Sequence, residues 1–335
     1  MAGPSAKAQH FVPRFLLSTF VDSTDKLRMF DFRTKRRSKQ SVKTVAFANN
    51  LYTLHGHDPG ALEAFFSRLE SEVAPVVRDI VAHGSIGSLT NDQQLAFAVF
   101  AGFQLLRVYG IRAYFEAYKG RRTSFALTAE GARASTTQGP DNPQAAHLAL
   151  MDAAKVDVAS RVLAATKRVL LAPGRVKFCI SDNPVVVYSS VCAAETGSTL
   201  QYALHTFAPG RALDLRKHLL DRLDQPGVEV YFPLSPDVCL FLCAPRTAAI
   251  VAPTDASLAL IDDEVRTLNL LQMLNARRFL YAKELDSFDE AIKLMDAMVG
   301  DTADELLYER LWNNHFVVNR TVGSGEDDRA RGDTA

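Results

Sequence analysis

Apolar residues recur at steps of three and four positions between Asp58 and Gly84, which is the spacing of one face of an α-helix. Asp58 can cap the start of this helix, Pro59 suits its first turn, and Gly84 can end it. Glu63 and Glu70 fall together on the border of the apolar face. The pattern therefore predicts a long amphipathic helix with two carboxylates that lean toward the protein interior.

A second helix is indicated by Thr90-Asn-Asp-Gln93, whose spacing is that of a capping box. Because the segment that follows is apolar on nearly all sides, we expect it to be buried. Gln104 and Arg107 lie on the same face of this helix and would be buried with it. A buried guanidinium requires a negative partner, and Glu70 and Asp182 are the two candidates.

The rest of the chain alternates between loop, helix and strand patterns. The second helix is expected to end near Tyr118, residues 120–143 to form a loop, and a third helix to run from about residue 144 to 170. Runs of β-branched and aromatic residues predict strands at 26–32, 42–47, 176–180, 185–188, 228–232, 238–243 and 278–282. Further helices are predicted at residues 262–277 and 288–298, and the latter leads into the apolar segment 306–312.

Together these elements predict an α+β fold, in which helices pack on a mostly antiparallel sheet. The N-terminal β-hairpin would join the strands that follow Arg175 in this sheet. We expect one domain over residues 9–317, because the polar N-terminal segment gains a role only if it meets the second half of the chain. Residues 318–335 have no apolar anchor and are predicted to form a disordered tail.

The composition of the chain narrows the classes of function. With 335 residues, 47% of them apolar, the chain can bury a large core. Its 38 basic and 38 acidic residues cancel, so no overall field would hold a nucleic acid or an anionic membrane. The one strongly basic stretch, residues 33–39, is interpreted as a solvated hairpin tip. The cysteines match neither a zinc site nor a disulfide framework, and without a signal-peptide segment we expect a cytoplasmic protein.

Two short polar motifs carry most of the candidate chemistry. The first, His10-Phe-Val-Pro-Arg14, places a histidine and an arginine beside a rigid proline. The second, Ser181-Asp-Asn-Pro184, follows a predicted strand, and its proline holds Asn183 in an extended conformation. Asp182 can act as a metal ligand or general base, with Asn183 orienting a substrate oxygen. Alternatively, Asp182 satisfies nearby backbone amides in a turn.

Structural interpretations compete with functional ones for the other polar residues. His10 can ligate a metal or be a hydrogen-bonded structural histidine, and Arg14 can hold an anion or form an ordinary salt bridge. Asn269 and Gln272 share one face of a predicted helix, where they can bind a substrate or join the helix to the sheet. The cluster His55-Gly-His57-Asp58 can bind a metal, although its aspartate is already needed as a helix cap.

On these residues the chain resembles the family of unknown function designated DUF4238. The resemblance rests on the His-x-x-Pro-Arg segment at residues 10–14 together with the Ser-Asp-Asn-Pro segment at 181–184, and it spans roughly residues 9–283. It implies that several residues match the recurring pattern of the family, namely His10, Pro13, Arg14, Glu70, Arg107, Asp182, Asn183, Pro184 and Asn269. It implies no activity, cofactor or catalytic assignment. Phe11 departs from the pattern, since a tyrosine is common there, which argues against a hydroxyl role at this position.

Two hypotheses about function follow. In the first, the chain is a nuclease-like, metal-assisted hydrolase of phosphodiesters, in which His10, Glu70 and Asp182 converge on a divalent cation or an attacking water. The substrate-binding residues would be Arg14, Gln104, Arg107, Asn183 and Asn269. In the second, the chain is a non-catalytic binding or regulatory module whose polar cluster is structural. The sequence leaves the cofactor and the partner open: a divalent metal, a small molecule and a nucleic acid are all compatible with it.

Overall fold

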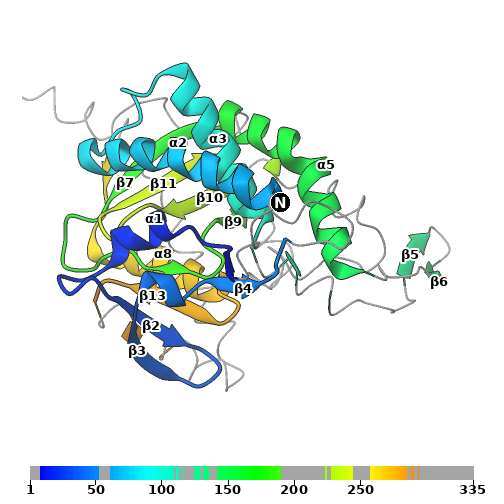
Figure 1. Ribbon diagram of the computed structural model, residues 1–335, viewed down its shortest axis with the longest axis horizontal. Coiled ribbons are helices and arrows are strands. Elements are labelled where there is room, and N and C mark those ends of the chain that lie inside the picture. The colour runs from blue at the N-terminus through cyan, green and yellow to red at the C-terminus, as the bar shows by residue number, and fades with distance from the viewer. Residues whose placement is uncertain are drawn as a thin grey trace, which may run out of the picture.

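Two larger β-sheets and a layer of helices form the described part of the chain (Figure 1). The computed structural model describes residues 8–52, 61–108, 111–112, 116, 124–128, 131–135, 142–189, 223–224, 228–243, 257–284, 288–289 and 293. Helices and mostly antiparallel strands are mixed along these residues, so the predicted α+β class is confirmed.

The larger sheet contains the most deeply buried strands. Its strand order is β12-β7-β11-β10-β9, and all of its pairs are antiparallel except β12 with β7. The strands are β7 (Thr166–Leu171), β9 (Val186–Ser189), β10 (Val228–Pro233), β11 (Val238–Cys243) and β12 (Leu258–Ala259). Every residue of β10 and β11 is buried, as expected for strands that are covered on both faces.

The smaller sheet joins the N-terminal hairpin to strands from the second half of the chain. Its order is β3-β2-β13-β8, and all of its pairs are antiparallel. The strands are β2 (Leu27–Asp31), β3 (Arg36–Gln40), β8 (Ile180–Ser181) and β13 (Phe279–Ala282). The hairpin therefore joins later strands as predicted, but the expectation of a single sheet is wrong, since the strands after Arg175 are divided between two sheets.

Helices cover the larger sheet on both faces. Figure 1 shows α2 (Ala61–His83), α3 (Asn91–Leu106) and α5 (Pro143–Ala164) on one side of it, while α8 (Asp262–Asn275) lies between the two sheets. Because side chains alternate along a strand, β10 sends Val230 and Phe232 into the core under α2, α3 and α5. It sends Tyr231 into a second core that contains residues of α8.

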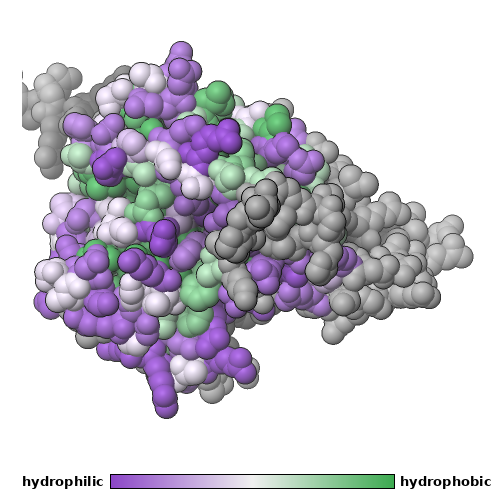
Figure 2. All heavy atoms as spheres, viewed as in Figure 1, coloured by the Kyte–Doolittle hydropathy of each residue, from purple (hydrophilic) through white to green (hydrophobic). Residues whose placement is uncertain are grey.

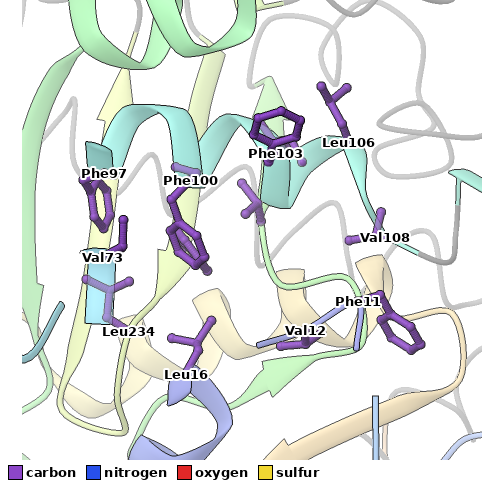
Figure 3. Packing of buried hydrophobic residues seen from close by; sticks show 14 of the residues in the cluster. Phe11, Val12, Leu16, Val73, Phe97, Phe100, Phe103, Leu106, Val108 and Leu234 are labelled. Carbon is purple, nitrogen blue, oxygen red and sulfur yellow. The ribbon is translucent and has the colours of Figure 1, made fainter. Parts of the chain in front are cut away.

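The N-terminal segment closes one side of the first core. It consists of β1 (Ala8–His10), α1 (Arg14–Leu17) and η1 (Ser18–Phe20), and β1 pairs with β4 (Phe47–Asn49). Figure 3 shows Phe11, Val12 and Leu16 of this segment in the same cluster as Phe97 and Phe100 of α3. Burial of these three apolar side chains of the N-terminal segment therefore anchors the first motif, His10–Arg14.

Helix ends follow the predicted signals in two places. Thr90 and Gln93 form a capping box at the start of α3. Gly84 ends α2 with a positive φ of 61°, and its amide donates to the carbonyl of Ile80 at 2.8 Å. Other ends were predicted wrongly: α3 ends at Leu106, and α5 ends at Ala164, after which residues 166–171 form β7 instead of more helix.

Two further predictions need correction. The second strand of the hairpin is the basic segment 36–40 and not the predicted segment 42–47. Residues 42–44 form the short helix η2 (Val42–Thr44), and Ser41 caps the start of this helix. Half of the basic stretch is therefore strand and only its start is a hairpin turn. Within the predicted loop at 120–143, β5 (Ser124–Thr128) and β6 (Gly131–Ser135) pair as a hairpin.

Several predictions concern residues that the structure does not describe. These are most of the helix at 288–298, the tail at 318–335 and the cluster at 55–58. The single domain over residues 9–317 likewise stays a prediction. No helix among the described residues combines the length and apolar character needed to cross a membrane. The described surface in Figure 2 is largely hydrophilic, with smaller hydrophobic areas between the polar ones.

Candidate functional site

His10 ends the short strand β1 and lies partly buried beside Phe47 of β4. The two residues are directly opposite in the β1–β4 register, and their ring centroids are 5.7 Å apart. The Nε2 atom of His10 is buried and has no hydrogen-bond partner among the described residues. Burial, followed by the positive charges of Arg14 and Arg107, lowers the pKa of His10, while the backbone of Val42 acts in the opposite direction. The imidazole is therefore neutral at pH 7.

Arg107 connects this segment to helix α2. It caps the end of α3 and is 1% exposed. Its guanidinium donates from Nε to the carbonyl of Phe11 at 3.2 Å and from Nη2 to Glu70 Oε1 at 2.7 Å and to the carbonyl of His10 at 3.4 Å. It also stacks on the ring of Phe66, 4.7 Å from the centroid. Of the two carboxylates predicted as partners for Arg107, the structure selects Glu70.

Two glutamines complete these contacts and leave polar atoms without partners. Gln104 Nε2 donates to the carbonyl of Phe11 at 2.7 Å, and Gln9 Oε1 accepts from the amide of Tyr52 at 2.7 Å. The Tyr52 hydroxyl donates to the carbonyl of Arg107 at 3.2 Å. Both glutamines are fully buried, and no described residue forms a hydrogen bond with Gln9 Nε2 or Gln104 Oε1. We name the group the Arg107 cluster: Gln9, His10, Tyr52, Glu70, Gln104 and Arg107.

A second carboxylate lies near the Arg107 cluster. Glu63 is two helical turns before Glu70 on α2, as the helical pattern predicts. Burial and the negative charge of Glu70 raise the pKa of Glu63, and the positive charge of Arg107 acts against them. Glu63 therefore keeps a proton more readily than an exposed glutamate does.

Asp182 lies at the end of β8, where its carboxylate accepts hydrogen bonds from backbone amides of the segment that leads into β13. Its Oδ1 accepts from the amide of Arg277 at 2.8 Å, and its Oδ2 accepts from those of Arg278 at 3.0 Å and Phe279 at 3.1 Å. Burial raises the pKa of Asp182 to about 6, and these amide donors act in the opposite direction. The carboxylate is therefore ionised at neutral pH and has both oxygens engaged.

Side chains of α8 hold the same turn from the other side. Gln272 Oε1 accepts from the amide and the hydroxyl of Ser181 at 3.0 and 2.9 Å, and its Nε2 donates to the carbonyl of Pro184 at 2.7 Å. Asn275 donates to the carbonyl of Asn183 at 2.8 Å. Asn269 accepts from the amide of Cys179 at 2.9 Å and donates to the carbonyl of Lys177 at 2.8 Å. We name this group the Asp182 cluster: Ser181, Asp182, Asn183, Asn269, Gln272 and Asn275.

The Asp182 cluster is also tied to the N-terminal hairpin. Arg278, whose amide donates to Asp182, forms a two-bond ion pair with Asp31 of β2 at 3.1 and 2.8 Å. The hydrogen bond from the Arg278 side chain lowers the pKa of Asp31. Asp182 therefore holds the backbone of Arg278, and the side chain of Arg278 holds the N-terminal hairpin through Asp31.

The predicted site residues fall into these two groups. His10, Glu70, Gln104 and Arg107 belong to the Arg107 cluster, and Asp182, Asn183 and Asn269 belong to the Asp182 cluster. Arg14 is exposed at the start of α1 and belongs to neither. Among the described residues, no group of three or more histidine, cysteine, aspartate or glutamate side chains is placed to hold a metal ion.

Tyr281 is the side chain through which the two clusters approach each other. It is fully buried on β13, and its position opposite Ile180 in the register of β13 with β8 places it next to the Asp182 segment. Burial, followed by the charge of Asp182, raises the pKa of Tyr281, and the backbone of Ala46 acts in the opposite direction. Ala46 in turn accepts the amide of Phe11 at 3.0 Å.

Several residues of these clusters were not predicted from the sequence. Neither motif contains the four residues Gln9, Tyr52, Asn275 and Tyr281. Their roles depend on partners that lie tens of positions away in the sequence. One signal was available for Gln9, because it is a polar residue directly beside a motif histidine. Asn275 lies one helical turn after Gln272, so the polar face already noted for Asn269 and Gln272 extends to it.

Comparison with known proteins identifies a family for this chain. No curated protein and no solved structure matches the chain. The family model described as "Protein of unknown function (DUF4238)" matches residues 8–286, which include both clusters. The chain therefore belongs to the DUF4238 family.

Proposed function

We propose that this protein is a non-catalytic binding module, in which the Asp182 cluster is a structural brace and the Arg107 cluster contributes the ligand-binding groups. The observation that carries the proposal is the contrast between the two clusters. Both oxygens of Asp182 are occupied by backbone amides, whereas Gln9, His10 and Gln104 each present a buried polar atom that has no hydrogen-bond partner in the part of the chain that the structure describes.

A catalytic role is poorly supported for Asp182. A general base or metal ligand needs a lone pair that faces the substrate or the ion. Asp182 is 5% exposed, and three backbone amides already point at its two oxygens. To act on a substrate it would have to release donors from the start of β13, which would leave buried amides unpaired at about 1–3 kcal/mol each.

The Arg107 cluster has the opposite property. A buried donor or acceptor without a partner costs about 1–3 kcal/mol, so a ligand that supplies the missing partners recovers that energy on binding. Gln9 Nε2 is a donor, Gln104 Oε1 is an acceptor, and neutral His10 Nε2 can be either, depending on its tautomer. This set fits a small polar molecule that carries both donors and acceptors.

The proposal is tested by comparing the wild-type chain with Asp182→Asn. Metal content, and hydrolysis of bis(p-nitrophenyl) phosphate and of single-stranded DNA with Mg²⁺, Mn²⁺ or Zn²⁺, are measured for both proteins beside thermal unfolding. We expect no bound metal and no hydrolysis by either protein, together with a lower unfolding temperature for the variant. Metal-dependent hydrolysis that is lost in a folded Asp182→Asn protein would overturn the proposal.

The second candidate is a hydrolase of phosphodiesters, and the state of His10 favours it. A neutral imidazole whose Nε2 has no partner can accept a proton from an attacking water. Arg14, exposed four positions later, would then neutralise the charge of a phosphate. His10→Gln separates the two candidates: loss of hydrolysis with an unchanged unfolding temperature supports the enzyme, and absence of hydrolysis in the wild type excludes it.

A further inference from the structure

Glu229 is a buried carboxyl group in the middle of the larger sheet, and neither motif includes it. It lies on β10 directly opposite Tyr188 of β9 and Cys243 of β11. Directly opposite residues of an antiparallel pair point to the same face of the sheet, so these three side chains form a row across it. Tyr231, two positions along β10 on the same face, donates from its hydroxyl to Glu229 Oε2 at 2.6 Å.

Among the residues that the structure describes, no positively charged side chain contributes to the pKa of Glu229. It is 5% exposed, and burial raises its pKa to about 7, with the hydrogen bond from Tyr231 as the opposing influence. Arg168 of β7 lies opposite Phe241, one row further along the sheet, and its charge acts on the thiol of Cys243. An ionised carboxylate in this position is costly unless a cation joins it.

We propose that Glu229, together with the rings of Tyr188 and Tyr231, forms a binding site for the ammonium group of a small primary alkylamine. The site is separate from the one under "Proposed function": Tyr231 belongs to the core on the α8 side of the larger sheet, whereas Tyr52 of the Arg107 cluster belongs to the core on the other side.

The chemistry of the row matches such a ligand. A primary ammonium supplies the missing positive charge and three N–H donors, and both the carboxylate and the phenolic oxygens can accept them. Aromatic rings beside a carboxylate add a further attraction for a cation. Tyr188 is only partly buried and lies on β9, the last strand in the order of the larger sheet, so this end of the row is the one nearest to solvent.

Binding should be coupled to the loss of a proton from Glu229. Below pH 7 the buried carboxyl group is protonated, so an ammonium ligand can bind well only after that proton leaves. The affinity should therefore increase about tenfold per pH unit below the pKa of Glu229 and become constant above it. A salt effect that does not involve Glu229 would show no such slope, because alkylammonium ions keep their own charge over this pH range.

The experiment measures binding of n-butylammonium chloride to the full chain at pH 5, 6, 7 and 8 by calorimetry and thermal shift. Sodium chloride and tetramethylammonium chloride at the same ionic strength are the references, since neither has N–H donors. We expect stabilisation by butylammonium above both references at pH 8, with the slope described above. Glu229→Gln should abolish this response, and Glu72→Gln, which removes an exposed carboxylate of α2, should leave it unchanged.

The result that overturns the proposal is an equal response to butylammonium and to the two reference salts at pH 8. An equal response of the wild type and Glu229→Gln would also overturn it. If Glu229→Gln does not fold, the pH dependence of binding to the wild type decides, because it needs no variant. Tyr188→Leu adds an independent test: it removes one ring at the partly exposed edge and should weaken binding several-fold.

Discussion

Replacement of Glu229 by Gln should stabilise the protein at alkaline pH and not at acidic pH. Gln keeps an oxygen that can accept the hydroxyl of Tyr231 but cannot ionise. The wild-type carboxyl group has its pKa raised by burial to about 7, against an ordinary value of 4.5. At pH 4 it is protonated in both the folded and the unfolded chain, so ionisation contributes nothing to the comparison there.

The size of the effect follows from the raised pKa of Glu229. As the pH rises from 4.5 to 7, the unfolded chain releases this proton while the folded chain retains it, so the folded state loses stability. The full loss is present above pH 7 and amounts to about 3 kcal/mol, at 1.36 kcal/mol for each tenfold change in proton affinity. The variant escapes this loss, so its advantage over wild type should grow by about 3 kcal/mol between pH 4 and pH 8.

Urea unfolding of wild type and variant at pH 4, 5, 6, 7 and 8 measures this difference. Other titrating groups act on both proteins, so the difference in unfolding free energy isolates Glu229. A difference that does not change with pH would refute the reasoning, because it would mean that Glu229 ionises as easily in the folded chain as in the unfolded one. A variant that becomes less stable as the pH rises would show that a cation within the protein already pairs with this carboxylate.

Three other changes test separate parts of the structure. Glu70→Gln keeps an oxygen that can accept a hydrogen bond from Arg107 but removes the negative charge opposite the buried guanidinium. Urea unfolding should show a loss of about 2–3 kcal/mol, which is moderated because Glu70 is itself a quarter exposed. Ala46 has a φ of 52°, which β-branched residues disfavour strongly. In thermal unfolding, Ala46→Val should lose more than about 2 kcal/mol, whereas Ala46→Gly should stay within about 1 kcal/mol of wild type. Burial lowers the pKa of His147 from 6.5 to about 4, so the protein should lose stability as pH falls between these values, and His147→Gln should remove that part of the loss in acid unfolding.

The helical part of the fold could be predicted well because its apolar pattern has a single interpretation. The spacing on α2 and α3 predicted both helices, and the cost of a buried charge gave Glu70 as one of two candidate partners for Arg107. The strand at 166–171 could not be predicted in the same way. It is a short apolar run directly after a helix, and such a run fits a continued helix as well as a buried strand.

The candidate site could be predicted only in part, because its partners are distant in sequence. The second motif was recognised as a turn with two interpretations, and the structural one expected Asp182 to accept hydrogen bonds from amides close to it in the sequence. In the structure the amides belong instead to residues 277–279, which the pairing of β8 with β13 brings beside Asp182. Glu229 was overlooked, although it carries a visible signal: it is a single charged residue inside an otherwise apolar strand, Val-Glu-Val-Tyr.

Amide hydrogen exchange at residues 277–279 tests most directly the claim that Asp182 is a structural brace. In Asp182→Ala these amides lose their acceptor, at about 3 kcal/mol for the group, so their exchange should become about 100-fold faster than in wild type. The amides shared between β10 and β11 serve as the reference and should exchange equally in both proteins. Unchanged exchange at residues 277–279 in the folded variant would contradict the account, because the carboxylate would then be free to face a substrate.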